Sequence, residues 1–187
     1  MANFHAQLQR SDFTHVNRID QPVILDTQHV AEHATHIYKH CLATQRVGAV
    51  DPTYLSRQQD INSQMRAILI DWLVEVHLKF KLLPETFYLT VNLIDRYLAQ
   101  TQIVRTKLQL VGVTCLLIAC KYEEIYPPIV SDIVYITDNA YSAGEILEME
   151  AKILVALDFE VTITSTYRFF ERYCYLTKPS DAEMFFA

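Results

Sequence analysis

The chain has 187 residues, of which 51% are hydrophobic, and it carries only three glycines and a formal net charge of −6. This apolar fraction suffices for one large buried core, and so few glycines argue against a Gly-rich nucleotide-binding loop or a turn-rich β fold. The acidic balance argues against a nucleic-acid-binding face. The first residues lack the apolar core of a signal peptide, so we expect no secretion.

Residues 1–25 show no sustained periodicity and are predicted to form a flexible arm. Residues 26–44 read as an amphipathic helix with Asp26 as its cap. One face of this helix carries four histidines, and two adjacent ones could bind a metal or protonate together at about pH 6. A solvated polar face is the favoured interpretation, so we expect no metal and no cofactor. The four are His29, His33, His36 and His40.

Residues 48–60 are predicted to be a linker, and a helix capped by Asn62 or Ser63 follows. On a helical wheel, five of its apolar residues are predicted to face the core, and a strip of charged residues is predicted to face solvent. Ile68 falls among the charges and Trp72 lies at their border. These two are either ordinary surface residues or part of a docking surface for a peptide with apolar and basic residues. The five core positions are Met65, Leu69, Leu73, Val76 and Phe80.

Pro84 opens the next helix, and residues 107–122 then form a helix that is apolar on every side. This segment is too short and too closely flanked by charges to span a membrane, so it is predicted to be the buried centre of a helical domain. Gly112 within it indicates a close approach by another helix. Thr106 is the expected cap, and Pro127 and Pro128 prevent continuation of the helix.

A short helix at residues 129–137 is predicted to end in a turn, and Ser142 and Glu145 form a capping box for the helix after it. Glu150 lies on the apolar face of that helix, and Lys121 ends the apolar run of the central helix. A buried charge without a partner is costly. The two residues therefore either pair with each other or contact a partner protein at the edge of the fold, and both can hold at once.

No catalytic motif is evident, and the four cysteines form no CxxC pair, so we expect neither an enzyme nor a disulfide or zinc framework. An extended connector at residues 161–164 and a last helix from about Ser165 complete the predicted elements.

Four segments resemble the cyclin box of mitotic cyclins, and they are closer to B-type than to A-type members. They are MRAILIDWLVEV, LIDRYL, KLQLVGVTCLLIACKYEEIYPP and TDNAYS, within residues 60–159. The resemblance implies an all-α, five-helix cyclin-box fold around a central buried helix at residues 60–160, preceded by an amino-terminal helix at 26–44. Residues 161–187 would be a connector and the start of a truncated second cyclin-like repeat.

The resemblance also implies a function, that of a non-catalytic subunit in the nucleus and cytoplasm. It would bind and activate a cyclin-dependent protein kinase and help to recruit its substrates during mitotic progression. The implied kinase-binding residues are Lys121, Glu150, Ile118, Tyr122 and Phe159. The implied docking patch for Arg-x-Leu peptides comprises Met65, Ile68, Leu69, Trp72, Glu75, Leu108 and Gln109.

Two other functions are open at this point. A cyclin-fold transcription factor would need a basic face for DNA, which the net charge disfavours. A metal-dependent enzyme would have to use the histidine face of the first helix, and a metal measurement on the purified protein would separate it from a binding module.

Overall fold

The computed structural model describes residues 20, 30–177 and 180. Within this part of the chain there are seven α-helices and no strand, which confirms the all-α class. The chain divides into two compact units, residues 47–167 and residues 1–46 with 168–187. We call these the box unit and the terminal unit and describe each by itself. The predicted arm and the Asp26 cap lie outside the described residues, except for Asp20.

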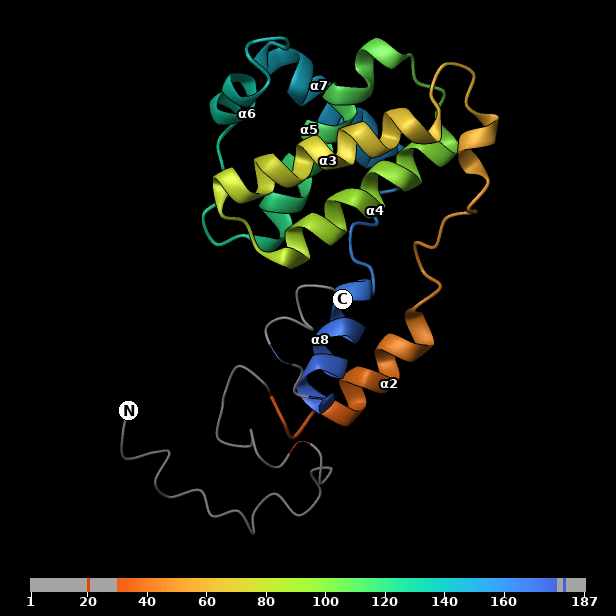
Figure 1. The fold of residues 1–187 in the computed structure, drawn as a ribbon, viewed down its shortest axis with the longest axis vertical. Coiled ribbons are helices and arrows are strands. Elements are labelled where there is room, and N and C mark those ends of the chain that lie inside the picture. The colour runs from red at the N-terminus through yellow and green to blue at the C-terminus, as the bar shows by residue number, and fades with distance from the viewer. Residues whose placement is uncertain (1–19, 21–29, 178–179, 181–187) are drawn as a thin grey trace. The chain divides into compact units, whose positions relative to one another are not determined.

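The box unit has five helices, four of which surround a buried central helix, as predicted. Helix α5 packs against α3, α4, α6 and α7, and Figure 1 shows α3 and α4 crossing one side of it. Every residue of α5 from 110 to 120 is buried. The helices are α3 (Ser63–Phe80), α4 (Pro84–Gln100), α5 (Leu108–Glu123), α6 (Val130–Ile136) and α7 (Ala143–Ala156).

The close approach predicted at Gly112 is present, and the partner is α3. A Cβ atom built on Gly112 would lie 2.7 Å from Leu69 Cδ1 and 3.1 Å from Cδ2. Leu69, Leu73 and Val76 form the buried face of α3, and Met65 and Phe80 pack partly buried against the same core. The absence of a side chain on Gly112 is therefore what lets α3 lie this close to α5.

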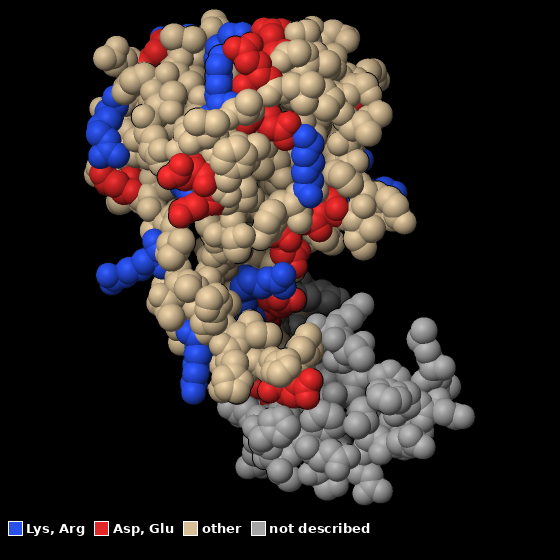
Figure 2. Space-filling view, turned by 180° about the vertical axis from the view of Figure 1, so that it is seen from behind, with Lys and Arg blue, Asp and Glu red and all other residues tan. Residues whose placement is uncertain are grey.

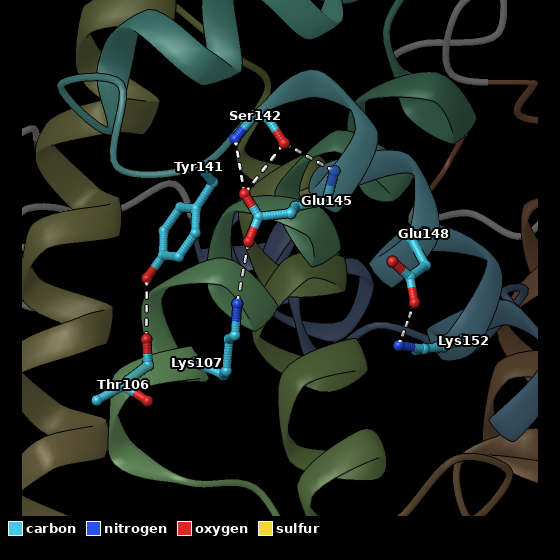
Figure 3. A network of polar contacts seen from close by, with 7 residues as sticks. All are labelled: Thr106, Lys107, Tyr141, Ser142, Glu145, Glu148 and Lys152. Atoms are coloured by element: carbon cyan, nitrogen blue, oxygen red, sulfur yellow. Dashed lines mark hydrogen bonds and ion pairs between the residues drawn. The ribbon is translucent and has the colours of Figure 1, made fainter.

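Three helix starts follow their local sequence. The Asn62 side chain accepts a hydrogen bond from the Met65 amide at 2.9 Å, and Pro84 occupies the first turn of α4. Ser142 and Glu145 form the reciprocal capping box at the start of α7 (Figure 3). The prediction for Thr106 is wrong: it lies in a 3₁₀ turn, Arg105–Lys107, and α5 begins without a side-chain cap. Tyr141 instead donates a hydrogen bond to the Thr106 carbonyl at 3.2 Å (Figure 3).

The predicted linker is tied to the box by a partly buried polar cluster. Its 3₁₀ turn, Tyr54–Arg57, buries Tyr54, whose hydroxyl donates to Asp95 Oδ1 at 2.6 Å. Arg66 of α3 donates to both oxygens of the same carboxylate, at 2.6 and 2.7 Å. Burial and this carboxylate together raise the pKa of Tyr54. One α4 carboxylate thus joins the linker, α3 and α4.

The terminal unit contains α2 (Ala34–Thr44) and the larger part of α8 (Thr166–Thr177). The predicted first helix begins later than the sequence suggested. Residues 30–33 form turns, and Val30 has a φ of 44°, which is not helical. Tyr38 of α2 contacts the Phe169 ring edge-on, with 6.0 Å between centroids. Arg172 lies over the Tyr38 ring and pairs with Asp20.

The structure also bears on membrane crossing and on the state of the cysteines. None of the described helices is both long enough and apolar enough to cross a membrane. All four cysteines are free thiols, and Cys115 and Cys120 are buried in α5. Burial raises the pKa of Cys120 to about 12 and also raises that of Cys115, so both remain protonated at neutral pH.

Asp95→Asn should destabilise the box unit. It leaves donors of Arg66 and Tyr54 without a charged acceptor in a partly buried place, which costs about 2–3 kcal/mol. Chemical denaturation at pH 7 measures this loss. The control is Asp51→Asn, which weakens an exposed pair with Arg57 and should change stability by less than about 1 kcal/mol. Equal effects of the two variants would contradict the structural role of Asp95.

Glu145→Gln should lower stability at neutral pH but not in acid. Hydrogen bonds from the Ser142 amide and from Lys107 hold the pKa of Glu145 at about 2, below its ordinary value of 4.5. A depressed pKa stabilises the fold above the unfolded-state value, and that stability is lost as pH falls toward the folded-state value. Glutamine keeps the cap without the charge. The difference in melting temperature between wild type and variant should therefore shrink from about pH 5 to about pH 2; a constant difference would contradict this.

Candidate interaction surfaces

Helix α3, the 3₁₀ turn Arg105–Lys107 and the start of α5 line an open apolar hollow of 290 Å³ on the surface of the box unit. We call it the docking pocket. Six of the seven residues predicted for the docking patch line it, and Glu75 does not. Ile68 is 63% exposed at its rim, whereas Leu69 and Leu108 are 6% and 5% exposed and form its inner wall. The lining residues are Met65, Ile68, Leu69, Trp72, Arg105, Leu108 and Gln109.

Trp72 is less exposed than the sequence indicated. It is half-buried and packs against the core, so its ring is both a wall of the docking pocket and a part of the fold. Glu75 lies one helical turn beyond Trp72 on α3 and is exposed. An exposed carboxylate therefore lies one helical turn beyond the apolar pocket without lining it.

Arg105 is the lining residue that sequence reasoning missed. Its side chain and backbone amide both bond to Asp60, with 2.7 Å between Arg105 Nε and Asp60 Oδ1 and 2.7 Å between the amide and Oδ2. This pair lowers the pKa of Asp60 and raises that of Arg105. The sequence near Arg105 shows only that it lies three residues before Leu108, a predicted member of the patch. The residue that holds its side chain in place, Asp60, lies 45 residues away in sequence.

Lys121 and Glu150 form an ion pair between the end of α5 and α7. The ammonium donates to both carboxylate oxygens, at 2.6 and 2.8 Å. The Lys121 side chain is 45% exposed and that of Glu150 is 14% exposed. The pairing predicted as one alternative is therefore present, and the lysine side is open to solvent; contact with a partner protein stays a prediction.

Aromatic side chains from the same two segments are exposed. Tyr122 follows Lys121 and is 49% exposed, and Phe159, beyond the end of α7, is 67% exposed. The Tyr122 hydroxyl lies 2.6 Å from Thr162 Oγ1, which joins the two segments. Phe159 has a φ of 58°, an uncommon conformation for a bulky residue and one often found at functional sites.

Ile118 is only 4% exposed, one helical turn before Tyr122. It is therefore part of the core beneath Lys121 and Tyr122 and exposes little surface to a partner. We call the whole set the ion-pair surface: Ile118, Lys121, Tyr122, Glu150 and Phe159.

The histidines predicted to lie on the first helix have no metal-binding arrangement in the described part of the chain. His33 lies 3.6 Å from Glu32, and no three His, Cys, Asp or Glu residues that the structure describes are placed to hold an ion. His29 lies outside the described residues. Figure 2 shows Lys and Arg interspersed with Asp and Glu over the face drawn, which is unlike the basic stripe of a nucleic-acid-binding face.

Comparison with known proteins shows similarity to mitotic cyclins. The "G2/mitotic-specific cyclin-1" of Medicago sativa subsp. varia is 47% identical over 155 residues, which are 83% of this chain and 36% of that protein. "Cyclin-B2-1" of Oryza sativa subsp. japonica is 51% identical over 142 residues, which are 76% of this chain and 34% of that protein. The chain thus spans about a third of the length of these relatives.

A solved structure and a family profile agree with these relatives. The X-ray structure of a viral cyclin from herpesvirus saimiri superposes with a TM-score of 0.67 at 25% identity, covering 80% of this chain and 64% of that one. The profile of the family "Cyclin, N-terminal domain" matches residues 36–162, more than half of the chain. With four helices packed around α5 and its similarity to B-type mitotic members, the chain belongs to the cyclin family.

Proposed function

We propose that the chain is a non-catalytic regulatory module that binds and activates a cyclin-dependent protein kinase and helps to recruit its substrates. It would thereby control mitotic progression, acting in the nucleus and cytoplasm. The observation that carries the proposal is the Lys121–Glu150 pair, which is fixed at 2.6 Å yet open to solvent beside two exposed aromatic residues. A surface whose side chains already hold one geometry suits protein binding, because little conformational freedom is lost on docking.

The proposed mechanism is a population shift. A kinase that exchanges between inactive and active arrangements is activated by a partner that binds the active one more tightly. Helix α5 is enclosed by four other helices, so the ion-pair surface loses little conformational freedom when it binds. A lysine ammonium has three donors, and two are used by Glu150, so one remains for a partner's acceptor.

The docking pocket is proposed to bind Arg-x-Leu segments of substrates or inhibitors. Its apolar wall suits the leucine side chain, and the exposed Glu75 carboxylate on the next turn of α3 suits the arginine. The chemistry of the pocket supports a peptide of this kind, because most of its lining is apolar and its one basic residue, Arg105, is already paired with Asp60.

A cyclin-fold transcription factor is not favoured as the alternative. The relatives named above are mitotic cyclins, and the net charge of −6 opposes binding to DNA phosphates.

Lys121→Met and Glu150→Gln should each weaken binding to a cyclin-dependent kinase by about 2 kcal/mol, because acceptors and donors on the kinase lose partners at a desolvated interface. Each change should cost at most about 1 kcal/mol of stability, since the lysine side of the pair is solvated. Kinase titration and thermal melting measure the two effects, and the double variant should bind no better than either single one.

A second ion pair on α7 provides the matched control. Lys152 and Glu148 are 2.6 Å apart and are 58% and 66% exposed. Lys152→Met and Glu148→Gln should leave kinase binding unchanged. Unfolding of the Lys121 and Glu150 single variants, with rescue by their double variant, would show a purely internal pair and end the interface proposal.

Ile68→Ala and Trp72→Ala should weaken binding of an Arg-x-Leu peptide. Trp72→Ala should cost about 2 kcal/mol or more, as for a buried aromatic anchor, and Ile68→Ala should cost about 1 kcal/mol. Fluorescence anisotropy of a labelled peptide measures both. Because Trp72 packs on the core, Ile68→Ala is the cleaner variant for the docking function.

Leu78→Ala is the control for the peptide experiment. Leu78 is 67% exposed on the same helix but does not line the pocket, so its loss should not change peptide affinity. Equal peptide affinity of the Ile68 variant and wild type would show that the pocket is not the peptide site.

A further inference from the structure

The two sides of Leu69 have different neighbours. One side faces the bare backbone of α5, where a Cβ on Gly112 would approach Leu69 Cδ1 to 2.7 Å. The other side is part of the wall of the docking pocket. One side chain therefore connects a glycine in the buried centre of the fold to the shape of an exposed pocket.

A side chain on Gly112 would move Leu69 toward the pocket. A contact under 3.0 Å cannot persist, so the leucine tip has to shift. Around it the core is closed, because Val111, Val113 and Leu73 are 0% exposed. The docking pocket is the open space that Leu69 borders among the described residues, so the tip has room on that side.

We propose that Gly112 sets the depth of the docking pocket by allowing the Leu69 methyl groups to rest against the α5 backbone. Gly112 is then a positioning residue that selects for the branched leucine side chain of an Arg-x-Leu peptide, and this inference rests on the proposed docking function. A shallower pocket would lose more affinity for a leucine side chain than for the shorter valine side chain. Gly112 therefore acts on selectivity as well as on affinity.

Gly112→Ala tests this role with little effect on the fold. Alanine has a higher helix propensity than glycine, which offsets part of the cost of moving a flexible side-chain tip. The variant should melt within a few degrees of wild type. It should bind an Arg-x-Leu peptide about four- to tenfold more weakly. Its preference for that peptide over an Arg-x-Val peptide should fall, a change in ratio that general destabilisation would not produce.

Two controls isolate the contact with Leu69. Gly144→Ala adds a methyl group at a helical glycine whose Cβ would meet only Ser142 Oγ, at 4.0 Å, so it should leave both peptide affinities unchanged. In a Leu69→Val background the shorter side chain relieves the clash, so Gly112→Ala should then have a smaller effect on affinity than it has alone. An equal effect in both backgrounds would overturn the proposal.

Trp72 supplies a readout that does not need the peptide. It is the one tryptophan of the chain and lines the pocket beside Leu69, so its emission should shift in Gly112→Ala and not in Gly144→Ala. If wild type binds no Arg-x-Leu peptide, the docking function fails, and the emission still decides whether Gly112 shapes the pocket. Unchanged emission and peptide preference overturn the inference. If Gly112→Ala does not fold, the Leu69→Val change should restore folding. Failure of this rescue would also overturn the inference.

Discussion

Burial of α5 from residue 110 to 120 is the constraint on which the rest of the box unit depends. A helix with no solvated face from residue 110 to 120 needs apolar cover on every side, and α3, α4, α6 and α7 supply it. Only the ends of α5 reach the surface. The start of the helix lines the docking pocket with Leu108 and Gln109. Its end contributes Lys121 and Tyr122 to the ion-pair surface. The helical rise places these ends about 20 Å apart. A kinase at one end would therefore leave the other end free for a peptide, as the proposed function requires.

Much of this arrangement could be predicted because its signals are local. An apolar run without a polar face identified the central helix, and Gly112 within it indicated where another helix approaches. The Asn62 cap and the Ser142–Glu145 box depend on residues three positions apart, so they could be recognised in the sequence. The docking patch was predicted through its resemblance to cyclins, and periodicity alone had placed only Ile68 and Trp72 at an exposed edge.

The parts that could not be predicted depend on partners distant in the chain. Helix α4 has no side-chain cap from its own sequence, and Glu124 accepts hydrogen bonds from the Leu83 amide at 2.8 Å and from Thr86 Oγ1 at 2.6 Å. Arg105 enters the pocket wall while held by Asp60, 45 residues away. Thr106 failed as a cap because a 3₁₀ turn precedes α5 and Tyr141 binds its carbonyl. A sequence pattern within one helical turn cannot indicate contacts between residues so far apart in the chain.

Two ion pairs of the box unit differ in what they contribute. The Arg66–Asp95 pair, with side chains 27% and 20% exposed, also binds the Tyr54 hydroxyl, so its donors and acceptors are used within the fold. The Lys121–Glu150 pair holds no third side chain in any hydrogen bond that we describe, and its lysine is 45% exposed. A half-solvated pair adds at most about 1 kcal/mol to stability. Stability is therefore a weak explanation for this geometry beside exposed aromatic side chains, and the proposed binding to a kinase would make use of a preoriented ammonium and carboxylate.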